Sequence, residues 1–317
     1  MKVRYLYVIP AFLVFQFIVL LVPGTGSETE PAYLGYSDYQ IITDKRFPAE
    51  DYFRMMASHG VNFQRIWVTG YSDVAVKFEE LMPFVKRGDR YKLSKISPEY
   101  IDRLLTVMQH AQKHNQQVML TLFDHWSIAR GFTKTPWYFK NNHERLLKNA
   151  LPDFYNIRDK KLMRIQENFV REIVRSTRKF DPIFEIMNEA GGEKCGGLAA
   201  WHEQVATWIL EESPNARIAV NLKSECMEVL DAEWVDIISF HQNIWERHGI
   251  CGAVKKYPDK HVIIDTDGAW EVRDDNRLVK KWLAETKSCG ASFNHKDDIY
   301  DLDRELLEHY GKVTERR

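Results

Sequence analysis

Short apolar runs alternate with amphipathic helical patterns along almost the whole chain, and this alternation constrains the fold more than any other feature. Eight runs are short and largely apolar, as strands buried on both faces are. They span residues 33–36, 61–68, 117–123, 182–188, 217–221, 235–240, 261–265 and 290–294. Because a helical pattern follows each run, the sequence predicts an α/β protein with parallel strands.

The helical segments carry recognisable start and stop signals. Pro48 opens the first helix and Gly60 ends it, while Ser97 and Pro98 open the second. Further helices are expected near residues 162–173, 199–210, 245–256, 278–283 and 299–307, with a short, weak helix at 224–230. One helix is therefore expected after each predicted strand.

Eight strand–helix repeats are the number found in a (β/α)8 TIM barrel, which is the fold class that we predict. An open doubly wound sheet could be written from the same elements, but the chain contains neither GxGxxG nor GxxxxGK[ST]. The connections after strands 2 and 3, residues 70–96 and 124–156, are long loops. Both follow strands, so we expect them to wall a cleft at the C-terminal end of the barrel.

The first 27 residues have the composition of a signal peptide. Lys2 and Arg4 precede an apolar run over residues 5–22, and a small, turn-forming run at 23–27 suits cleavage. We therefore expect residues 28–317 to form a single (β/α)8 catalytic domain that is secreted or periplasmic. The apolar run is long for a signal peptide, so an uncleaved membrane anchor through residues 5–22 is the alternative.

The charge balance gives no indication of a nucleic-acid partner. The 44 basic and 45 acidic residues leave a net charge of −1, without the excess of Lys and Arg that such partners require. The chain also contains 9 Trp and 14 Tyr, the residue types that stack on flat apolar ligand faces such as those of sugars.

Four cysteines make disulfides possible in an exported protein. They allow three connectivities, and we favour the pair Cys195–Cys226 because both would follow adjacent strands. The remaining two are Cys251 and Cys289, and four separate buried thiols are the alternative. No CxxC occurs, which argues against a zinc site made of thiolates.

Polar and aromatic side chains gather after the predicted strands, where α/β folds place their chemistry. They are Arg65, Trp67 and Thr69 after the second strand, Asp124, His125 and Trp126 after the third, Asn188 and Glu189 after the fourth, His241 and Asn243 after the sixth, Asp265, Asp267 and Trp270 after the seventh, and Asn294 and His295 after the eighth. Two of these residues have an alternative interpretation without a role in a site. Arg65 could form a structural ion pair, and His241 could be a hydrogen-bonded histidine of the core.

The run from Pro182 to Ala190 is the most informative of these segments. It is apolar and ends abruptly in Asn188-Glu189, which delivers an amide and a carboxylic acid to the end of a buried strand. A glutamate in that setting can have a raised pKa and serve as a general acid or base. The alternative is that Glu189 only caps the next helix.

These segments resemble the retaining glycoside hydrolases of the (β/α)8 clan, most closely the family-5 cellulase and mannanase group. Residues 184–189, Phe-Glu-Ile-Met-Asn-Glu, match that family's strand-four motif. The resemblance implies that Glu189 is the acid/base and that Asn188 binds the sugar 2-hydroxyl. It also implies that Arg65, in the run 60–66, supports the nucleophile, and that His125 and His241 are substrate-binding histidines.

The seventh strand departs from the family pattern, which places a catalytic Glu before a Gly. Here residues 262–268 read Val-Ile-Ile-Asp-Thr-Asp-Gly, and aligning on Gly268 puts Thr266 at the nucleophile position. Asp265 or Asp267 could replace that Glu, and we favour Asp265 because it directly continues the apolar run. Retention needs carboxyl groups about 5–5.5 Å apart, and inversion needs about 6.5–9.5 Å. The side chain of Asp is shorter than that of Glu, which could widen the gap between the two carboxyl groups and favour inversion.

The eighth strand departs as well. The family usually ends it with a sugar-stacking Trp, whereas residues 291–295 read Ala-Ser-Phe-Asn-His. Trp126 or Trp270 would then supply the stacking platform, and His295 a further contact to the substrate.

The mechanism implied by the resemblance uses two carboxyl groups and requires no cofactor and no metal. Glu189 protonates the leaving glycosidic oxygen, and an Asp on the seventh strand attacks the anomeric carbon or activates a water. Arg65 and His241 would keep that Asp ionised, and the partner is a carbohydrate substrate. His110 and His114 have a spacing that could bind a metal, but no acid motif lies near them in sequence, so we interpret them as part of a solvated helix face.

Two other functions compete with hydrolysis of a glycan. A non-catalytic carbohydrate-binding barrel would explain the missing Glu on the seventh strand. The sequence Asp-Thr-Asp-Gly at 265–268 also resembles the nucleophile motif of haloacid-dehalogenase-type phosphatases. That family needs Thr or Val where Ala269 stands, and a long α/β domain downstream of the motif, whereas 49 residues follow Gly268 in this sequence (317 − 268 = 49).

Overall fold

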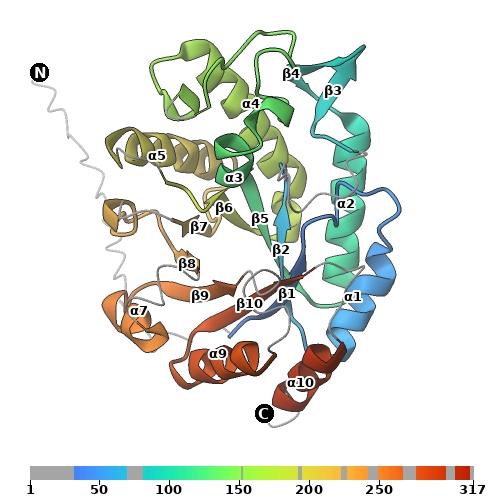
Figure 1. Cartoon of the computed structure of the whole chain (residues 1–317), viewed down its shortest axis with the longest axis vertical. Coiled ribbons are helices and arrows are strands. Elements are labelled where there is room, and N and C mark those ends of the chain that lie inside the picture. Colours follow the sequence, from blue (N-terminus) through green and yellow to red (C-terminus); the bar gives the residue numbers. More distant parts are fainter. Residues whose placement is uncertain are drawn as a thin grey trace, which may run out of the picture. The chain divides into compact units, whose positions relative to one another are not determined.

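The computed structural model describes residues 32–69, 81–150, 153–191, 195–222, 227–241, 249–266, 276–297 and 304–314. At its centre eight parallel strands form a closed barrel, in the order β1-β10-β9-β8-β7-β6-β5-β2. The helices surround this barrel (Figure 1). The predicted (β/α)8 fold is thereby confirmed.

All eight predicted strands are present, with ends that differ from the predicted ones by at most three residues. They are β1 (Leu34–Asp38), β2 (Phe63–Trp67), β5 (Gln117–Asp124), β6 (Ile183–Asn188), β7 (Ile218–Asn221), β8 (Ile237–His241), β9 (His261–Thr266) and β10 (Ser292–Asp297). The largest difference is at β10, which continues three residues beyond the predicted end at Asn294. The extension makes His295 and Lys296 part of the strand.

The predicted helices also lie where the sequence indicates. They are α1 (Ala49–Ser58), α2 (Pro98–Lys113), α4 (Lys160–Thr177), α5 (Cys195–Glu212), α7 (Ile250–Lys256), α9 (Asn276–Ser288) and α10 (Arg304–Thr314), and the weak segment forms the 3-10 helix η4 (Met227–Val229). The short helices α3 (His125–Ala129), η1 (Phe132–Lys134), η2 (Asp153–Tyr155) and η3 (Arg178–Phe180) were not predicted. None of the described helices is long and apolar enough to cross a bilayer.

A β-hairpin lies in the connection after β2, where the sequence analysis expected only a loop. Its strands β3 (Phe84–Arg87) and β4 (Arg90–Ile96) pair antiparallel, and the turn at Gly88 has a φ of +63°. Figure 1 shows the hairpin above α2. The carboxylate of Glu144, in the connection after β5, accepts backbone hydrogen bonds from Leu93 (3.0 Å) and Ser94 (3.1 Å) of β4. The two long connections are therefore joined to each other.

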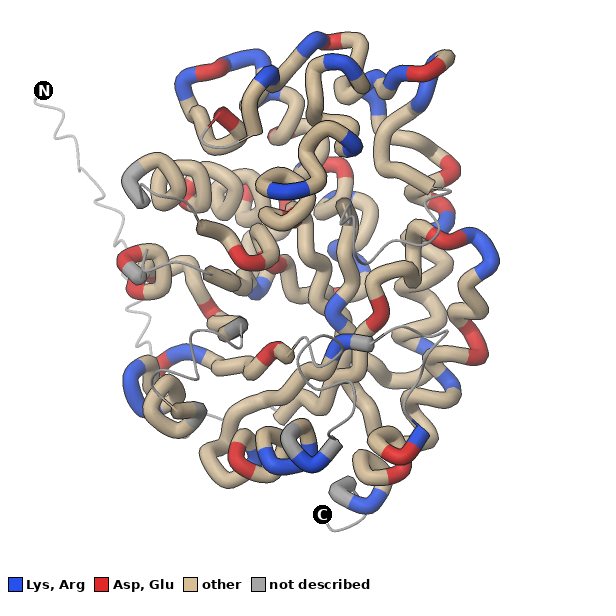
Figure 2. Tube along the Cα trace, in the orientation of Figure 1, with Lys and Arg blue, Asp and Glu red and all other residues tan. Residues whose placement is uncertain are grey.

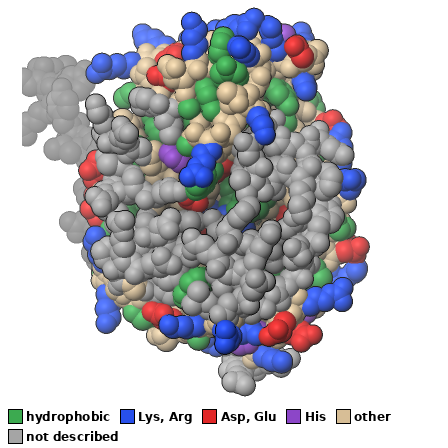
Figure 3. Space-filling view, in the orientation of Figure 1, with side chains coloured by type: hydrophobic (Ala, Val, Ile, Leu, Met, Phe, Trp, Pro, Cys, Tyr) green, Lys and Arg blue, Asp and Glu red, His purple; other side chains and the backbone are tan. Residues whose placement is uncertain are grey.

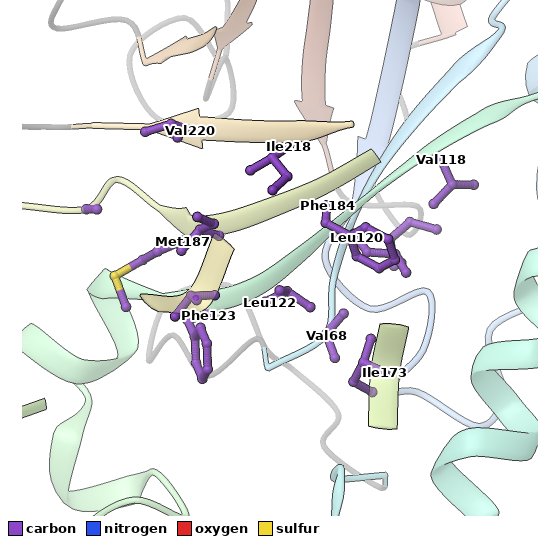
Figure 4. Packing of buried hydrophobic residues seen from close by; sticks show 14 of the residues in the cluster. Val68, Val118, Leu120, Leu122, Phe123, Ile173, Phe184, Met187, Ile218 and Val220 are labelled. Carbon is purple, nitrogen blue, oxygen red and sulfur yellow. The ribbon is translucent and has the colours of Figure 1, made fainter. Parts of the chain in front are cut away.

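The hydrophobic core has an outer part, between the strands and the helices, and an inner part inside the barrel. In the outer part, Leu120, Phe184 and Ile218 of the strands belong to the same cluster of buried side chains as Ile173 of α4 (Figure 4). The inner part is one layer of seven buried residues, six from barrel strands and one, Tyr33, directly before β1; the six are Phe63, Met119, Ile183, Ala219, Ile237 and Ile263.

A polar layer lies directly above that inner apolar layer. Residues two apart on a strand share a face, so the position two residues further along each strand also points into the barrel. On six strands these positions hold the buried polar residues Arg65, Thr121, Glu185, Asn221, Ser239 and Asp265. The barrel interior therefore changes from apolar to polar toward the C-terminal ends of the strands.

A disulfide links α7 to α9 through Cys251 and Cys289, whose Cα atoms are 5.2 Å apart. Four separate thiols, the alternative considered above, are therefore excluded. The predicted Cys195–Cys226 pair is compatible with this bridge, but Cys226 lies outside the described residues, so that pairing stays a prediction.

Candidate active site

Arg65 is the centre of a buried charge network inside the barrel. Its Nε and Nη2 donate to Glu185 Oε2 of β6 (2.9 and 2.6 Å), and its Nη1 donates to Asp265 Oδ2 of β9 (2.5 Å). Nη2 also donates to Asn188 Oδ1 (2.7 Å). All three charged side chains are fully buried, so one guanidinium fixes two carboxylates and the motif amide at once.

Asp265 is held from a second side by β10. Its Oδ1 accepts a hydrogen bond from Asn294 Nδ2 (2.6 Å), and Asn294 Oδ1 in turn accepts from Ser37 Oγ of β1 (2.7 Å). Ser37 Oγ also accepts the backbone N–H of Arg65 (2.7 Å). Both carboxylate oxygens of Asp265 therefore have donors, and β1, β2, β9 and β10 together fix its position.

Asn188 connects the network to a third carboxyl group, that of Asp124 at the end of β5. Asn188 Nδ2 donates to Asp124 Oδ1 (2.8 Å), while the backbone N–H of Ser127 (2.9 Å) and its hydroxyl donate to Asp124 Oδ2. Asp124 is thus the N-cap of α3 as well as the partner of the motif amide. Two fixed partners, Arg65 and Asp124, determine the orientation of the Asn188 amide.

Glu189 directly follows β6 at the same end of the barrel and is 1% exposed. Its φ is +46°, a left-handed conformation that L-residues other than glycine seldom adopt. Its backbone N–H donates to Asn221 Oδ1 of β7 (2.9 Å), and Asn221 Nδ2 donates to Ser239 Oγ of β8 (3.1 Å). Glu189 lies well before the first residue of α5, Cys195, so it does not cap that helix.

The carboxyl groups of Asp124 and Glu185 have raised pKa values. Burial is the main cause for Asp124, and the nearby charge of Glu189 adds to it, while hydrogen bonds from Ser127 and Asn188 oppose it. Burial also raises the pKa of Glu185, against the opposing effect of Arg65. The interior therefore resists holding several negative charges at once.

The predicted substrate-binding residues His125 and Trp126 lie at the start of α3 and are half-buried. His125 Nδ1 is 3.1 Å from the hydroxyl of Tyr155, and the guanidinium of Arg130 lies 4.2 Å from the ring centroid of Trp126. Both side chains belong to the C-terminal end of β5, as the sequence predicts.

His295 lies on the opposite side of β10 from the inward-facing Asn294. Its Nδ1 is 3.1 Å from Thr266 Oγ1, and its ring meets that of Tyr36, which packs on Tyr310 of α10. Successive side chains of a strand point to opposite faces, so His295 and Thr266 face the helices. The structure therefore does not bring His295 into the interior group with Arg65 and Asp265, because alternate residues of β10 point to opposite faces.

Four predicted residues fall partly or wholly outside the described part of the chain. Asn243, Asp267 and Trp270 lie outside it, and for His241 only the backbone is described. That backbone is at the end of β8 and is paired in register with Asp265.

The sequence analysis missed Lys296, which follows His295 on β10 and is only 2% exposed. It shares the inward face with Asn294, two residues before it. Its ammonium lies 4.3 Å from the ring centroid of Tyr39 and 4.9 Å from that of Trp67. The predicted strand ended at Asn294, two residues before this lysine. Among the described residues, no group of three or more His, Cys, Asp or Glu is arranged to hold a metal ion.

Solved structures similar to this one include several glycoside hydrolases. The endo-1,4-β-mannanase from Rhizomucor miehei is 13% identical with a TM-score of 0.63, covering 90% of this chain and 95% of that chain. The endo-1,4-β-D-mannanase from Thermotoga petrophila RKU-1 is 14% identical with a TM-score of 0.62, covering 89% and 100%. The glycoside hydrolase family 5 mannosidase from Rhizomucor miehei is 13% identical with a TM-score of 0.57, covering 90% and 95%.

This chain has the fold of those enzymes. The likeness extends over nearly the whole described barrel, as the family-5 resemblance of the sequence implies. No protein-family model matches the sequence, and no curated protein matches it either. At 12–14% identity the likeness is one of architecture, so the assignment of chemistry depends on the residues of the site.

Proposed function

We propose that this protein is a glycoside hydrolase that cleaves O-glycosidic bonds in a polysaccharide or oligosaccharide. One observation carries the proposal: Arg65 binds Asn188 of the strand-four motif and Asp265 of the seventh barrel strand at the same time. The backbone of Glu189 directly follows that motif amide. A carboxylic acid and a carboxylate are thereby held at the same end of the barrel, which is the arrangement that two-carboxylate hydrolysis needs.

In the proposed mechanism, Glu189 gives its proton to the glycosidic oxygen as the bond to the anomeric carbon breaks. Asp265 attacks that carbon, or removes a proton from the water that attacks it. The positive charge of Arg65 keeps Asp265 ionised. The Asp265 carboxylate can then stabilise the positive charge of the oxocarbenium-like transition state. Asp267 is the alternative second carboxylate.

Asn188 would bind the sugar hydroxyl next to the anomeric carbon. Its orientation by Arg65 and Asp124 supports this role, because an amide with fixed partners presents its remaining hydrogen-bonding capacity in one direction. Because several of the similar structures are mannanases, a β-1,4-linked mannan is the first neutral substrate to test.

The alternative is a carbohydrate-binding barrel without catalysis. The observation in its favour is that the seventh strand carries Asp265 and no Glu, so a shorter acid stands where the resemblance implies the nucleophile.

Hydrolysis by residues 28–317 across a panel of polysaccharides and aryl glycosides tests the proposal. We expect cleavage of at least one glycan and its loss in Glu189→Gln, with the anomeric form of the first product separating retention from inversion. Binding of oligosaccharides by a folded wild type that cleaves none of them would instead favour the binding barrel.

We further propose that the protein works outside the cytoplasm, with residues 1–27 acting as a signal peptide. The Cys251–Cys289 disulfide supports this, because such bonds persist in oxidising compartments. The sequence at the amino terminus of the mature protein, determined after export, would test it.

A further inference from the structure

The inward face of the barrel at the C-terminal end of β10 carries a buried cation. Lys296 Nζ lies over the rings of Tyr39 (4.3 Å) and Trp67 (4.9 Å), and those two rings are 4.5 Å apart. Tyr39 follows β1 and Trp67 ends β2, so three neighbouring strands build this corner. Figure 2 shows Lys and Arg stretches among the central strands as well as on the outer helices.

Keeping a lysine in this corner costs free energy. Burial disfavours the charged form and lowers the pKa of Lys296 well below its usual value. The faces of the two aromatic rings attract the ammonium and offset part of that cost. A substrate group with a negative charge would be attracted to an ammonium in this corner more strongly than in water, because the buried region has a low dielectric.

Trp67 adds a second donor to the same corner. Its side chain is 1% exposed, and its indole N–H has no hydrogen-bond acceptor among the described residues. A buried donor left without a partner is unfavourable, so an arriving acceptor oxygen would be stabilised by it. The guanidinium of Arg65 lies 4.5 Å from the ring of Trp67, but its nitrogens already donate to Glu185, Asp265 and Asn188.

We propose that Lys296 and the indole N–H of Trp67 bind an anionic substituent of the sugar, so that the substrate is an acidic glycan. A carboxylate or a sulfate ester has oxygens that can accept from both donors. The inference rests on the proposed function only in taking the ligand to be a glycan held at this end of the barrel. It goes beyond that function because it assigns the glycan a negatively charged substituent, which a neutral mannan lacks. Figure 3 shows Lys and Arg side chains mainly around the outside of the molecule in this view, with Asp and Glu side chains among them.

Binding measured by calorimetry on the uncleaving Glu189→Gln variant of residues 28–317 tests the proposal. The probes are three oligosaccharide series of matched length: neutral β-1,4-mannosides, their β-1,4-mannuronate counterparts and their sulfated counterparts. We expect at least one acidic series to bind about tenfold or more tighter than the neutral series, as for hydrogen bonds to charged groups. The mannuronate and sulfate arms separate the two possible sources of charge.

Substitutions then assign the preference to this corner. Lys296→Met should abolish the preference for the acidic series, and Lys296→Arg should keep most of it. Trp67→Phe, which keeps a ring and removes the N–H, should weaken acidic ligands severalfold and leave neutral ones unchanged. Lys45→Met, at an exposed ion pair with Glu99, is the matched control and should change neither.

Equal binding of neutral and acidic series, binding of neither, or a preference that survives Lys296→Met would each overturn the inference. Its failure can be distinguished from failure of the proposed function. Hydrolysis of neutral glycans without an acidic preference would refute only the acidic site. Acidic binding that depends on Lys296, in a wild type that cleaves nothing, would refute only the hydrolase.

Discussion

Arg65 contributes both to the stability of the fold and to the arrangement of the candidate site. Its guanidinium is fully buried between the carboxylates of Glu185 and Asp265, and β2, β6 and β9 contribute these three side chains. Two buried carboxylates are tolerable only because this cation is paired with them. The resemblance implied that Arg65 would support the carboxylate on the seventh strand. The pairing of Arg65 with Glu185 was not predicted, because Glu185 lies within an otherwise apolar run.

We predict that Arg65→Met lowers the free energy of unfolding by about 3–5 kcal/mol, because it leaves two buried carboxylates without their cation. Urea unfolding followed by circular dichroism measures the change. The control is Arg54→Met, which removes an exposed ion pair with Asp51 and should cost no more than about 1 kcal/mol. Equal losses in the two variants would contradict the assignment.

Asp124 gives a prediction about pH. Burial raises the pKa of its carboxyl group, so the folded protein binds that proton more tightly than the unfolded chain does. The contribution of Asp124 to stability therefore falls as the pH rises from about 4 through the folded pKa. Asp124→Asn removes this ionisation, and its stability relative to the wild type should become more favourable over that range.

Urea unfolding of both proteins at a series of pH values measures this trend. Asp124→Asn also keeps only one acceptor oxygen for the Ser127 and Asn188 donors, which shifts the difference by an offset that does not depend on pH. A difference that stays constant, or that grows in favour of the wild type as the pH rises, would show that the pKa of Asp124 is not raised.

At the scale of elements, the pairing of β1 with β10 positions the second carboxylate. Gly35 of β1 faces Asn294, and a Cβ at Gly35 would lie 2.3 Å from Asn294 Oδ1 and 2.7 Å from Phe63 Cδ1. Only glycine allows Asn294 to remain where it donates to Asp265. This requirement is invisible in the sequence, where Gly35 reads as one small residue in a short strand.

We predict that Gly35→Ala displaces Asn294 and lowers the free energy of unfolding by about 1–3 kcal/mol, as overpacking of a filled interior does. It should also reduce any glycan hydrolysis, because Asp265 loses a donor. The control is Gly197→Ala in α5, where the new Cβ meets nothing within 4 Å and should raise stability by up to about 1 kcal/mol. A Gly35→Ala protein as stable and active as the wild type would refute this role.

The elements that were predicted correctly from the sequence are those with a clear hydrophobic pattern. Each barrel strand is a buried run, and each long helix has one apolar face, so hydrophobicity alone indicates both. The β3–β4 hairpin was missed although Gly88 and Asp89 form a two-residue turn between its strands, which is a recognised hairpin signal. Lys296 was missed for another reason: a strand end misplaced by a few residues hides which side chains share its inward face.

At the scale of the whole molecule, the barrel gathers side chains that are far apart in sequence. Arg65 and Asp265 are 200 residues apart and are joined by a direct hydrogen bond. The count of strands and helices predicted this closure, because parallel strands with helical connections bring all their C-terminal ends to one face. The Cys251–Cys289 pairing was not predicted, since it depends on how α7 and α9 pack against each other.

We predict that removing this disulfide lowers the free energy of unfolding by about 2–4 kcal/mol, because the bond closes a loop between residues separated by 38 positions. Cys251→Ser and the double variant Cys251→Ser/Cys289→Ser should lose similar amounts. Thermal unfolding of the oxidised and reduced wild type gives an independent measure. No change on reduction would mean that the bond does not constrain the unfolded chain.

The central claim is that Glu189 is the proton donor to a glycosidic oxygen, and leaving-group dependence tests it most directly. The measurement is kcat/KM of the wild type and Glu189→Gln, on an oligosaccharide substrate and on its dinitrophenyl glycoside, whose leaving group needs no proton. We predict a loss of about 10²–10⁴-fold on the oligosaccharide and a much smaller loss on the dinitrophenyl glycoside. Equal losses on both substrates, or no loss on either, would contradict the account.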